Sequence, residues 1–128
     1  MSHSPTFDGL SELGQIGISV RDLRAATDFY AQILGLPLLF EMPSMAFFDL
    51  GGVRLMLAVA EREELCHPSS ILYFKVADIR AAHAALAAKG VVFEREPTLV
   101  ATMPDHELWM AFFRDGERNL HALMSEVR

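Results

Sequence analysis

The sequence predicts one α+β domain, residues 1–128, in which two βαβββ modules form a curved mixed sheet around a central cleft. The first observation is an internal repeat, because residues 16–26 and 72–82 share a valine, an aspartate, an arginine and two alanines at one constant offset. The second is that a glycine-containing turn and an alternating strand follow each predicted helix. The third is the length of 128 residues, which would leave two separate cores marginal.

The first module spans about residues 13–59 and begins with a strand in which apolar residues alternate. Asp22 follows at the position of a helix N-cap, where its carboxylate accepts backbone N–H bonds. Apolar residues between positions 26 and 34 recur at helical spacing, and Gly35 followed by Pro37 ends the helix. After a turn at Gly51 and Gly52, residues 53–59 alternate again and complete the module.

A charged connector of about residues 60–69 precedes the second module, which spans about residues 70–125. There Asp78 is the predicted helix cap, Lys89 and Gly90 end the helix, and a turn at Gly116 leads into a strand over 120–124. A single module of this size cannot bury one face of a four-stranded sheet. We therefore expect a shared core in which the helices cover one face of the strands and the other face lines the cleft.

The paired units of strand, Val-x-Asp-[Leu/Ile]-x-x-Ala and helix resemble the vicinal oxygen chelate superfamily over about residues 13–124. That superfamily includes glyoxalase I, extradiol dioxygenases, methylmalonyl-CoA epimerase, fosfomycin-resistance proteins and metal-free bleomycin-binding proteins. The resemblance implies the curved fold described above and a homodimer. It does not specify an activity.

Many members hold a divalent metal with one residue at the start of each module's first strand and one in each last strand. The resemblance places Gln15, Met56, Ile71 and Ala122 at these positions. Isoleucine and alanine carry no donor atom, and an amide with a thioether does not replace imidazole and carboxylate ligands. We therefore predict that the metal centre is absent and that no cofactor is bound. The superfamily's Asp-Pro-Asp-Gly-Asn turn is altered at residues 115–119, so a one-residue shift of the last strand stays open.

Histidines offer one weak candidate for chemistry. His3 lies in the N-terminal tail, His67 in the connector, His83 inside the second helix and His121 on the strand face opposite the cleft. His106 alone is expected to face the cleft, where it would act as an acid or base; the alternative is a turn histidine without a chemical task.

Strand alternation and the non-repeated stretch 103–110 define the other expected ligand contacts. Arg54 interrupts an apolar strand on the cleft side, where it would either bind a carboxylate or phosphate or extend to solvent. Tyr73 would donate a hydrogen bond to a ligand or be a core tyrosine that reaches water, and Trp109 would stack on a planar ligand or belong to the core or a dimer interface. The full expected set is Gln15, Arg54, Met56, Ile71, Tyr73, His106, Trp109 and Ala122.

The composition argues against two classes of binding partner, nucleic acids and membranes. The formal charge of −6 without a basic run disfavours nucleic acid, and the absence of an apolar run of roughly 18 residues disfavours a membrane span. Cys66 is the only cysteine, which fits a reducing, cytoplasmic setting.

The leading hypothesis is a metal-independent protein that binds a small molecule, with no decision on whether a reaction follows. One alternative is a metal-dependent lyase, isomerase or dioxygenase whose donors lie elsewhere in the alignment. Another is a non-catalytic, dimeric interaction protein.

Overall fold

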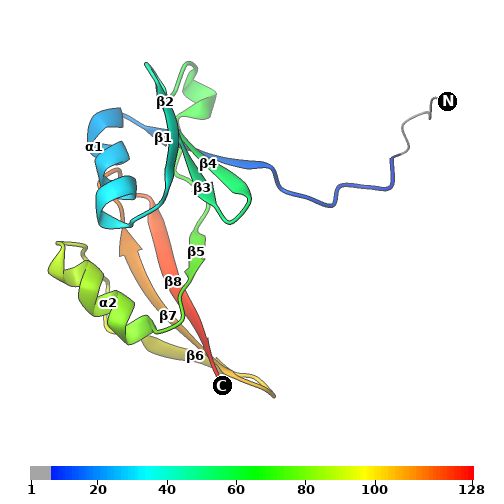
Figure 1. Cartoon of the computed structure of the whole chain (residues 1–128), viewed down its shortest axis with the longest axis vertical. Helices are drawn as coiled ribbons and strands as arrows, with labels where there is room; N and C mark the ends of the chain where they lie inside the picture. Colours follow the sequence, from blue (N-terminus) through cyan, green and yellow to red (C-terminus); the bar gives the residue numbers. More distant parts are fainter. Residues whose placement is uncertain (1–6) are drawn as a thin grey trace.

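The computed structural model describes residues 7–128, so His3 lies outside the described part of the chain. Its strands form two four-stranded mixed sheets, with the orders β1-β4-β3-β2 and β5-β8-β7-β6 (Figure 1). In each sheet the first strand pairs in parallel with the last, and the remaining pairs are antiparallel. The elements are β1 (Gln15–Val20), α1 (Leu23–Asp28), η1 (Phe29–Ile33), β2 (Leu38–Met42), β3 (Met45–Leu50), β4 (Val53–Val59), η2 (Glu63–Leu65), β5 (Leu72–Lys75), α2 (Ile79–Ala88), β6 (Thr98–Thr102), β7 (Glu107–Arg114) and β8 (Leu120–Val127).

The prediction of an α+β fold from two βαβββ modules is confirmed. Each module contributes one of the two sheets, and no β-ladder joins β1 to β5 within residues 7–128. The modules meet through side chains of the first helix and the turn between β7 and β8, rather than through strand edges.

The helix starts follow the repeat in the sequence. Asp22 Oδ1 accepts a hydrogen bond from Ala25 N at 3.1 Å, and Asp78 Oδ1 accepts the same bond from Ala81 N at 3.1 Å. Each carboxylate therefore satisfies one backbone N–H that the first helical turn leaves without a partner. Gly90, with a φ of 95°, ends α2 at the predicted place.

The two helices differ in their second halves. α1 passes into the π-helical segment η1, in which Leu34 N donates to Phe29 O at 2.9 Å across five residues. Leu36 N then donates to Tyr30 O at 2.9 Å, and Gly35 has a φ of 77°. Apolar spacing alone does not separate α from π geometry, so the sequence predicted one continuous helix here.

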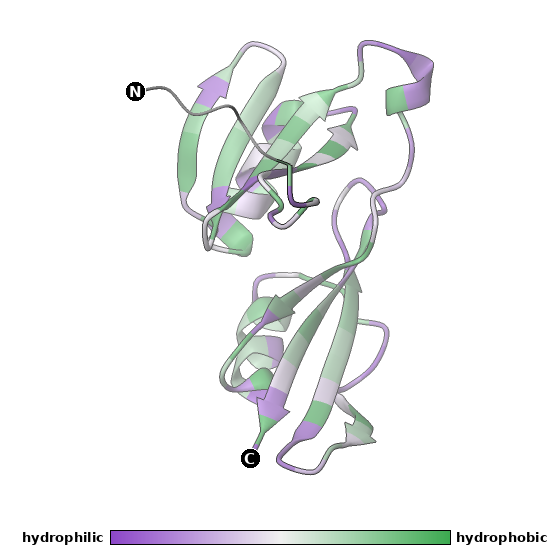
Figure 2. Ribbon diagram, turned by 90° about the vertical axis from the view of Figure 1, so that its right-hand side faces the viewer, coloured by the Kyte–Doolittle hydropathy of each residue, from purple (hydrophilic) through white to green (hydrophobic). Residues whose placement is uncertain are grey.

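The helices cover the same side of the two sheets. Figure 1 shows α1 and α2 on one side of the strands, and Figure 2, turned by 90°, shows both sheets in front of their helices. Ile18, Val20, Leu55 and Leu57 are buried beneath α1, as alternation predicted. Both sheets therefore turn their uncovered faces, called here the open sheet faces, to the same side of the molecule.

Within residues 7–128 no helix combines the length and apolar character that crossing a bilayer would require.

Candidate functional site

The open sheet face of the first module brings together three of the expected residues. In the register of β1 and β4, Gln15 pairs with Arg54 and Gly17 pairs with Met56. The Gln15 amide Nε2 lies 3.5 Å from Met56 Sδ, and a Cβ on Gly17 would lie 3.4 Å from Met56 Cε. Glycine therefore leaves the space into which the flexible thioether extends.

Arg54 is exposed at the end of this patch, and its Cζ lies 5.7 Å from the centroid of the Phe47 ring. Phe47 in turn stacks on Phe40, with ring centroids 4.5 Å apart and an interplanar angle of 24°. No carboxylate lies within 4.0 Å of the Arg54 guanidinium among the described residues. The ring holds the guanidinium while its N–H donors stay available for an anionic group.

The open sheet face of the second module is aromatic. Ala122 on β8 pairs with Tyr73 on one side and Phe112 on the other. The Tyr73 and Phe112 rings meet edge to face, with centroids 6.2 Å apart, and Ala122 is fully buried. The small methyl group allows the two rings to meet across the intervening strand. Tyr73 remains 47% exposed.

The donors at the four positions that bind metal in many superfamily members do not fit a divalent ion. Met56 and Gln15 offer a thioether and an amide, whereas Ile71 and Ala122 offer no donor atom. Across residues 7–128, no group of three or more His, Cys, Asp and Glu side chains lies close enough to hold a metal ion. The absence of a metal centre in the protein stays a prediction.

Two expected residues lie away from the open sheet faces. His106 is in the turn between β6 and β7, where its Nδ1 lies 2.7 Å from Asp105 Oδ1; this hydrogen bond lowers the pKa of Asp105. Trp109 projects from β7 on the same side as buried Ala111 and Phe113, because alternate residues share a face. It packs against the core beneath Arg80, whose Cζ is 5.3 Å from the indole centroid, so the structure places it on the helix side of the sheet and away from the open sheet face.

The open sheet faces also carry two rings that the sequence-based set lacked, Phe47 and Phe112. Each belongs to a Phe-Phe pair, at residues 47–48 and 112–113. Alternation requires one ring of such a pair to face each side of the sheet, so the signal was present in the sequence.

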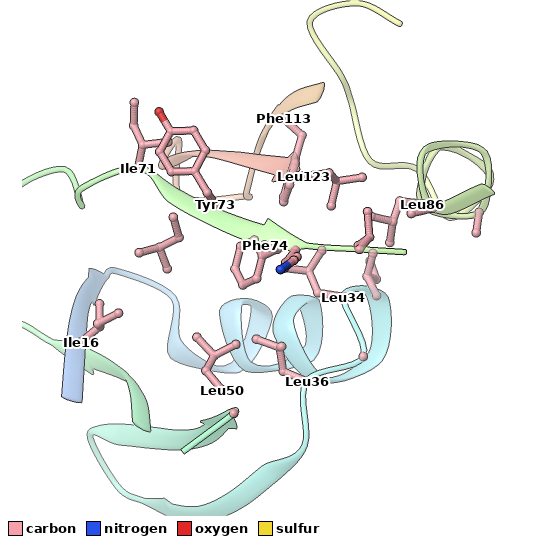
Figure 3. A pocket seen from close by; sticks show the side chains of 18 of the residues that line it. Ile16, Leu34, Leu36, Leu50, Ile71, Tyr73, Phe74, Leu86, Phe113 and Leu123 are labelled. Atoms are coloured by element: carbon pink, nitrogen blue, oxygen red, sulfur yellow. The ribbon is translucent and has the colours of Figure 1, made fainter. Parts of the chain in front are cut away.

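A hollow with a volume of about 940 Å³ lies between the modules, next to β5. We call it the intermodular hollow. Ile71 and Tyr73 reach it, and Figure 3 shows further apolar side chains converging on it from both modules. The labelled members are Ile16, Leu34, Leu36, Leu50, Phe74, Leu86, Phe113 and Leu123.

A buried polar network joins the modules. Tyr30 OH donates to Asp115 Oδ2 at 2.6 Å and lies 2.8 Å from His121 Nε2. Because the phenol proton points to Asp115, the neutral His121 ring is protonated on Nε2 and donates to the phenol oxygen. Asp115 also accepts from Glu117 N at 2.8 Å and from Asn119 N at 2.8 Å. Burial lowers the pKa of His121 and raises the pKa of Tyr30, with the Asp115 charge acting further on Tyr30.

This network includes the altered turn at residues 115–119. Asp115 and Asn119 keep their hydrogen bonds, whereas Arg118 has a φ of 69° in the position of the superfamily's glycine. Glu117 accepts bonds from Arg21 N at 3.0 Å and Asp22 N at 2.9 Å, which ties the turn to the start of α1.

The profile of the Glyoxalase/Bleomycin resistance protein/Dioxygenase superfamily matches residues 12–120 of this chain. The two-module fold and this match together define the class: the chain belongs to that superfamily. The protein YraH of Bacillus subtilis is 30% identical over 126 residues, covering 85% of this chain and 94% of YraH.

Solved structures agree on the fold. An integron cassette protein from the mobile metagenome of V. cholerae superposes with a TM-score of 0.77 at 19% identity, covering 94% of this chain and 98% of that one. TnmS3, an antibiotic binding protein from Streptomyces sp. CB03234, superposes with a TM-score of 0.71 at 21% identity, covering 94% of this chain and 99% of that one.

Proposed function

We propose that this protein binds a small molecule on its open sheet faces without the help of a metal ion. The observation that carries the proposal is the chemistry of four positions, where an amide, a thioether, an isoleucine and an alanine methyl stand in place of metal ligands. Binding then relies on apolar contact and on a few polar groups that orient the ligand.

The side chains favour a ligand with an aromatic or apolar body and one anionic group. Tyr73 and Phe112 present an aromatic surface on the second module, and Met56 is an adaptable apolar group on the first. Arg54, held over Phe47, suits a carboxylate or phosphate. TnmS3, an antibiotic binding protein, has the same fold and supports capture of a small molecule as a use of that fold.

A homodimer is part of the proposal. Both open sheet faces point to the same side, and they carry exposed apolar side chains, among them Phe40 at 44%, Met42 at 50% and Tyr73 at 47% exposure. A second copy placed over this side would bury these side chains and exclude water from the ligand.

The test uses the purified chain without added metal. Aromatic carboxylates and aryl phosphates are screened by thermal shift in the presence of EDTA, and the hits are measured by isothermal titration. We expect a stabilising ligand whose affinity falls at least tenfold in Arg54→Ala and is unchanged in Arg95→Ala, the matched exposed arginine.

Two outcomes would contradict parts of the proposal. A stoichiometric divalent metal after gentle purification, lost together with ligand binding in Gln15→Ala, would support the metal-dependent lyase, isomerase or dioxygenase alternative. Sedimentation equilibrium that shows only monomer at all concentrations would remove the dimer from the proposal.

A further inference from the structure

We propose that the intermodular hollow is a second binding site, which takes a single-chain anionic amphiphile such as a long-chain carboxylate. The alkyl chain lies between the two modules, and the carboxylate is held near Lys89. Arg54, Met56 and Phe112 of the proposed function do not line this hollow, whereas Tyr73 borders both sites.

The walls of the hollow are mostly aliphatic, with some aromatic side chains, and come from distant parts of the chain. Leu34 and Leu36 follow the first helix, Leu86 belongs to α2, Leu50 precedes the turn between β3 and β4, and Phe74 projects from β5 (Figure 3). The volume of about 940 Å³ lies near the upper end of the range of roughly 300–1,000 Å³ found for small-molecule sites. Apolar surface of this extent is suited to a flexible hydrocarbon chain.

The charged lining has one sign. Lys75 and Lys89 line the hollow, and no aspartate or glutamate does, although the chain carries a formal charge of −6. Lys75 Nζ is 3.8 Å from Glu126 Oε1 and is thereby partly neutralised. Lys89 has no carboxylate within 4.0 Å in the part of the chain that the structure describes. An anionic head group is therefore the complement of this hollow.

The lining excludes strongly polar ligands. Apart from the two lysines, Tyr73 is the only lining side chain that can form a hydrogen bond. A sugar or nucleotide placed here would lose hydrogen bonds to water without replacement, which opposes binding. A hydrocarbon chain has none to lose, and each buried methylene raises affinity about fourfold.

Isothermal titration with dodecanoate below its micelle concentration tests the site on the full-length chain. We expect saturable binding at least tenfold tighter than that of dodecyltrimethylammonium, which has the same chain and the opposite charge. Tetradecanoate should bind more tightly than dodecanoate.

Two pairs of variants locate the site. Ala85 is exposed and lines the hollow, whereas Ala84 is exposed on the same helix and does not. Ala85→Trp should weaken dodecanoate binding at least tenfold, and Ala84→Trp should leave it unchanged. Lys89→Glu should reduce the preference for the anionic amphiphile, whereas Arg95→Glu, with the same change of charge, should not. Far-UV circular dichroism and melting midpoints check the fold of all four variants.

Three results would overturn the inference: equal binding of both amphiphiles, equal loss in Ala84→Trp and Ala85→Trp, or a dimer that dissociates in ligand-free Ala85→Trp. The last result would identify the hollow as an interface between copies. Should Ala85→Trp fail to fold, the charge comparison of Lys89→Glu with Arg95→Glu decides alone. Arg54→Ala should not change dodecanoate binding, so this test is independent of the proposed function.

Discussion

The open sheet faces of the two modules use the same backbone register with the sizes of the side chains exchanged. In the first module a small residue on the outer strand, Gly17, pairs with the large Met56 on the central strand. In the second the outer strand carries the large Tyr73, which pairs with the small Ala122. The exchange keeps each patch filled, so we expect the combined volume of each pair of facing side chains to limit which residues fit there.

The two helices differ in what they pack against. α2 packs on its own sheet, whereas the first helix also serves the other module, because Phe29 and Leu34 pack against both core clusters. Tyr30 hydrogen bonds to Asp115 and His121 of the second module. The π-helical segment η1, which contains Phe29 and Tyr30, is therefore the part of the first helix that contacts the second module.

The largest effect is expected from the aspartate of this junction. Asp115→Ala leaves Tyr30 OH and the N–H groups of Glu117 and Asn119 without their acceptor, and should cost about 3 kcal/mol or more of unfolding free energy in urea. Asp49, in the turn of the first module, accepts only from exposed Gly52 N among the described residues, so Asp49→Ala should cost less than about 1 kcal/mol. Equal costs would show that the junction is not stabilised by this network.

The exchange of side-chain sizes is tested by making the second module resemble the first. Ala122→Met inserts a long side chain where the Tyr73 and Phe112 rings meet and should destabilise the protein by about 1–3 kcal/mol. In a Tyr73→Ala background the same change should cost at least about 0.5 kcal/mol less. Urea unfolding of the four proteins of this double-mutant cycle measures the difference, and strict additivity would contradict the paired constraint.

The buried histidine gives a pH dependence. Burial holds the pKa of His121 below its ordinary 6.5, so the unfolded chain binds a proton that the folded chain rejects. Stability should therefore fall as the pH drops through about 6.5, seen in urea midpoints at pH 7.5 and 5.5. His121→Gln should flatten this slope, whereas His67→Ala, in the exposed connector, should not.

Tyr30 is expected to make the stability of the fold pH-dependent in the alkaline range. Its folded pKa is raised, so its contribution is intact below pH 10 and is lost as the unfolded tyrosine ionises above that value. Melting midpoints between pH 9 and 11 should fall more steeply in the natural chain than in Tyr30→Phe, after correction for the lower starting stability of the variant.

The smallest expected effect concerns the two hairpin turns. The first uses Gly51 and Gly52 at positive φ, whereas the second holds Arg118 at a φ of 69°. Arg118→Gly should remove left-handed strain and raise the melting midpoint by about 2 °C, because greater unfolded-state entropy offsets part of the gain. Gly51→Ala should lower the midpoint, and the same sign for both changes would rule out strain at Arg118.

Local features of the fold were determined by the sequence. Helix caps at Asp22 and Asp78, the end of α2 at Gly90, and the buried faces of β1 and β4 all follow from patterns within a few residues. Among the expected site residues, Gln15, Arg54 and Met56 come together because they occupy paired strands of one module.

Tertiary structure decided what lies between the modules. Tyr30 and Asp115 are 85 positions apart, and no local sequence pattern predicts their hydrogen bond. The intermodular hollow is likewise lined mostly by apolar residues that, from the pattern of their own strand or helix, would be predicted to lie in the core. Trp109 packs on the helix side and His106 lies in the hairpin turn because strand register and turn geometry placed them there. Periodicity within an element fixes which face a side chain takes, whereas the packing of whole elements determines what that face meets.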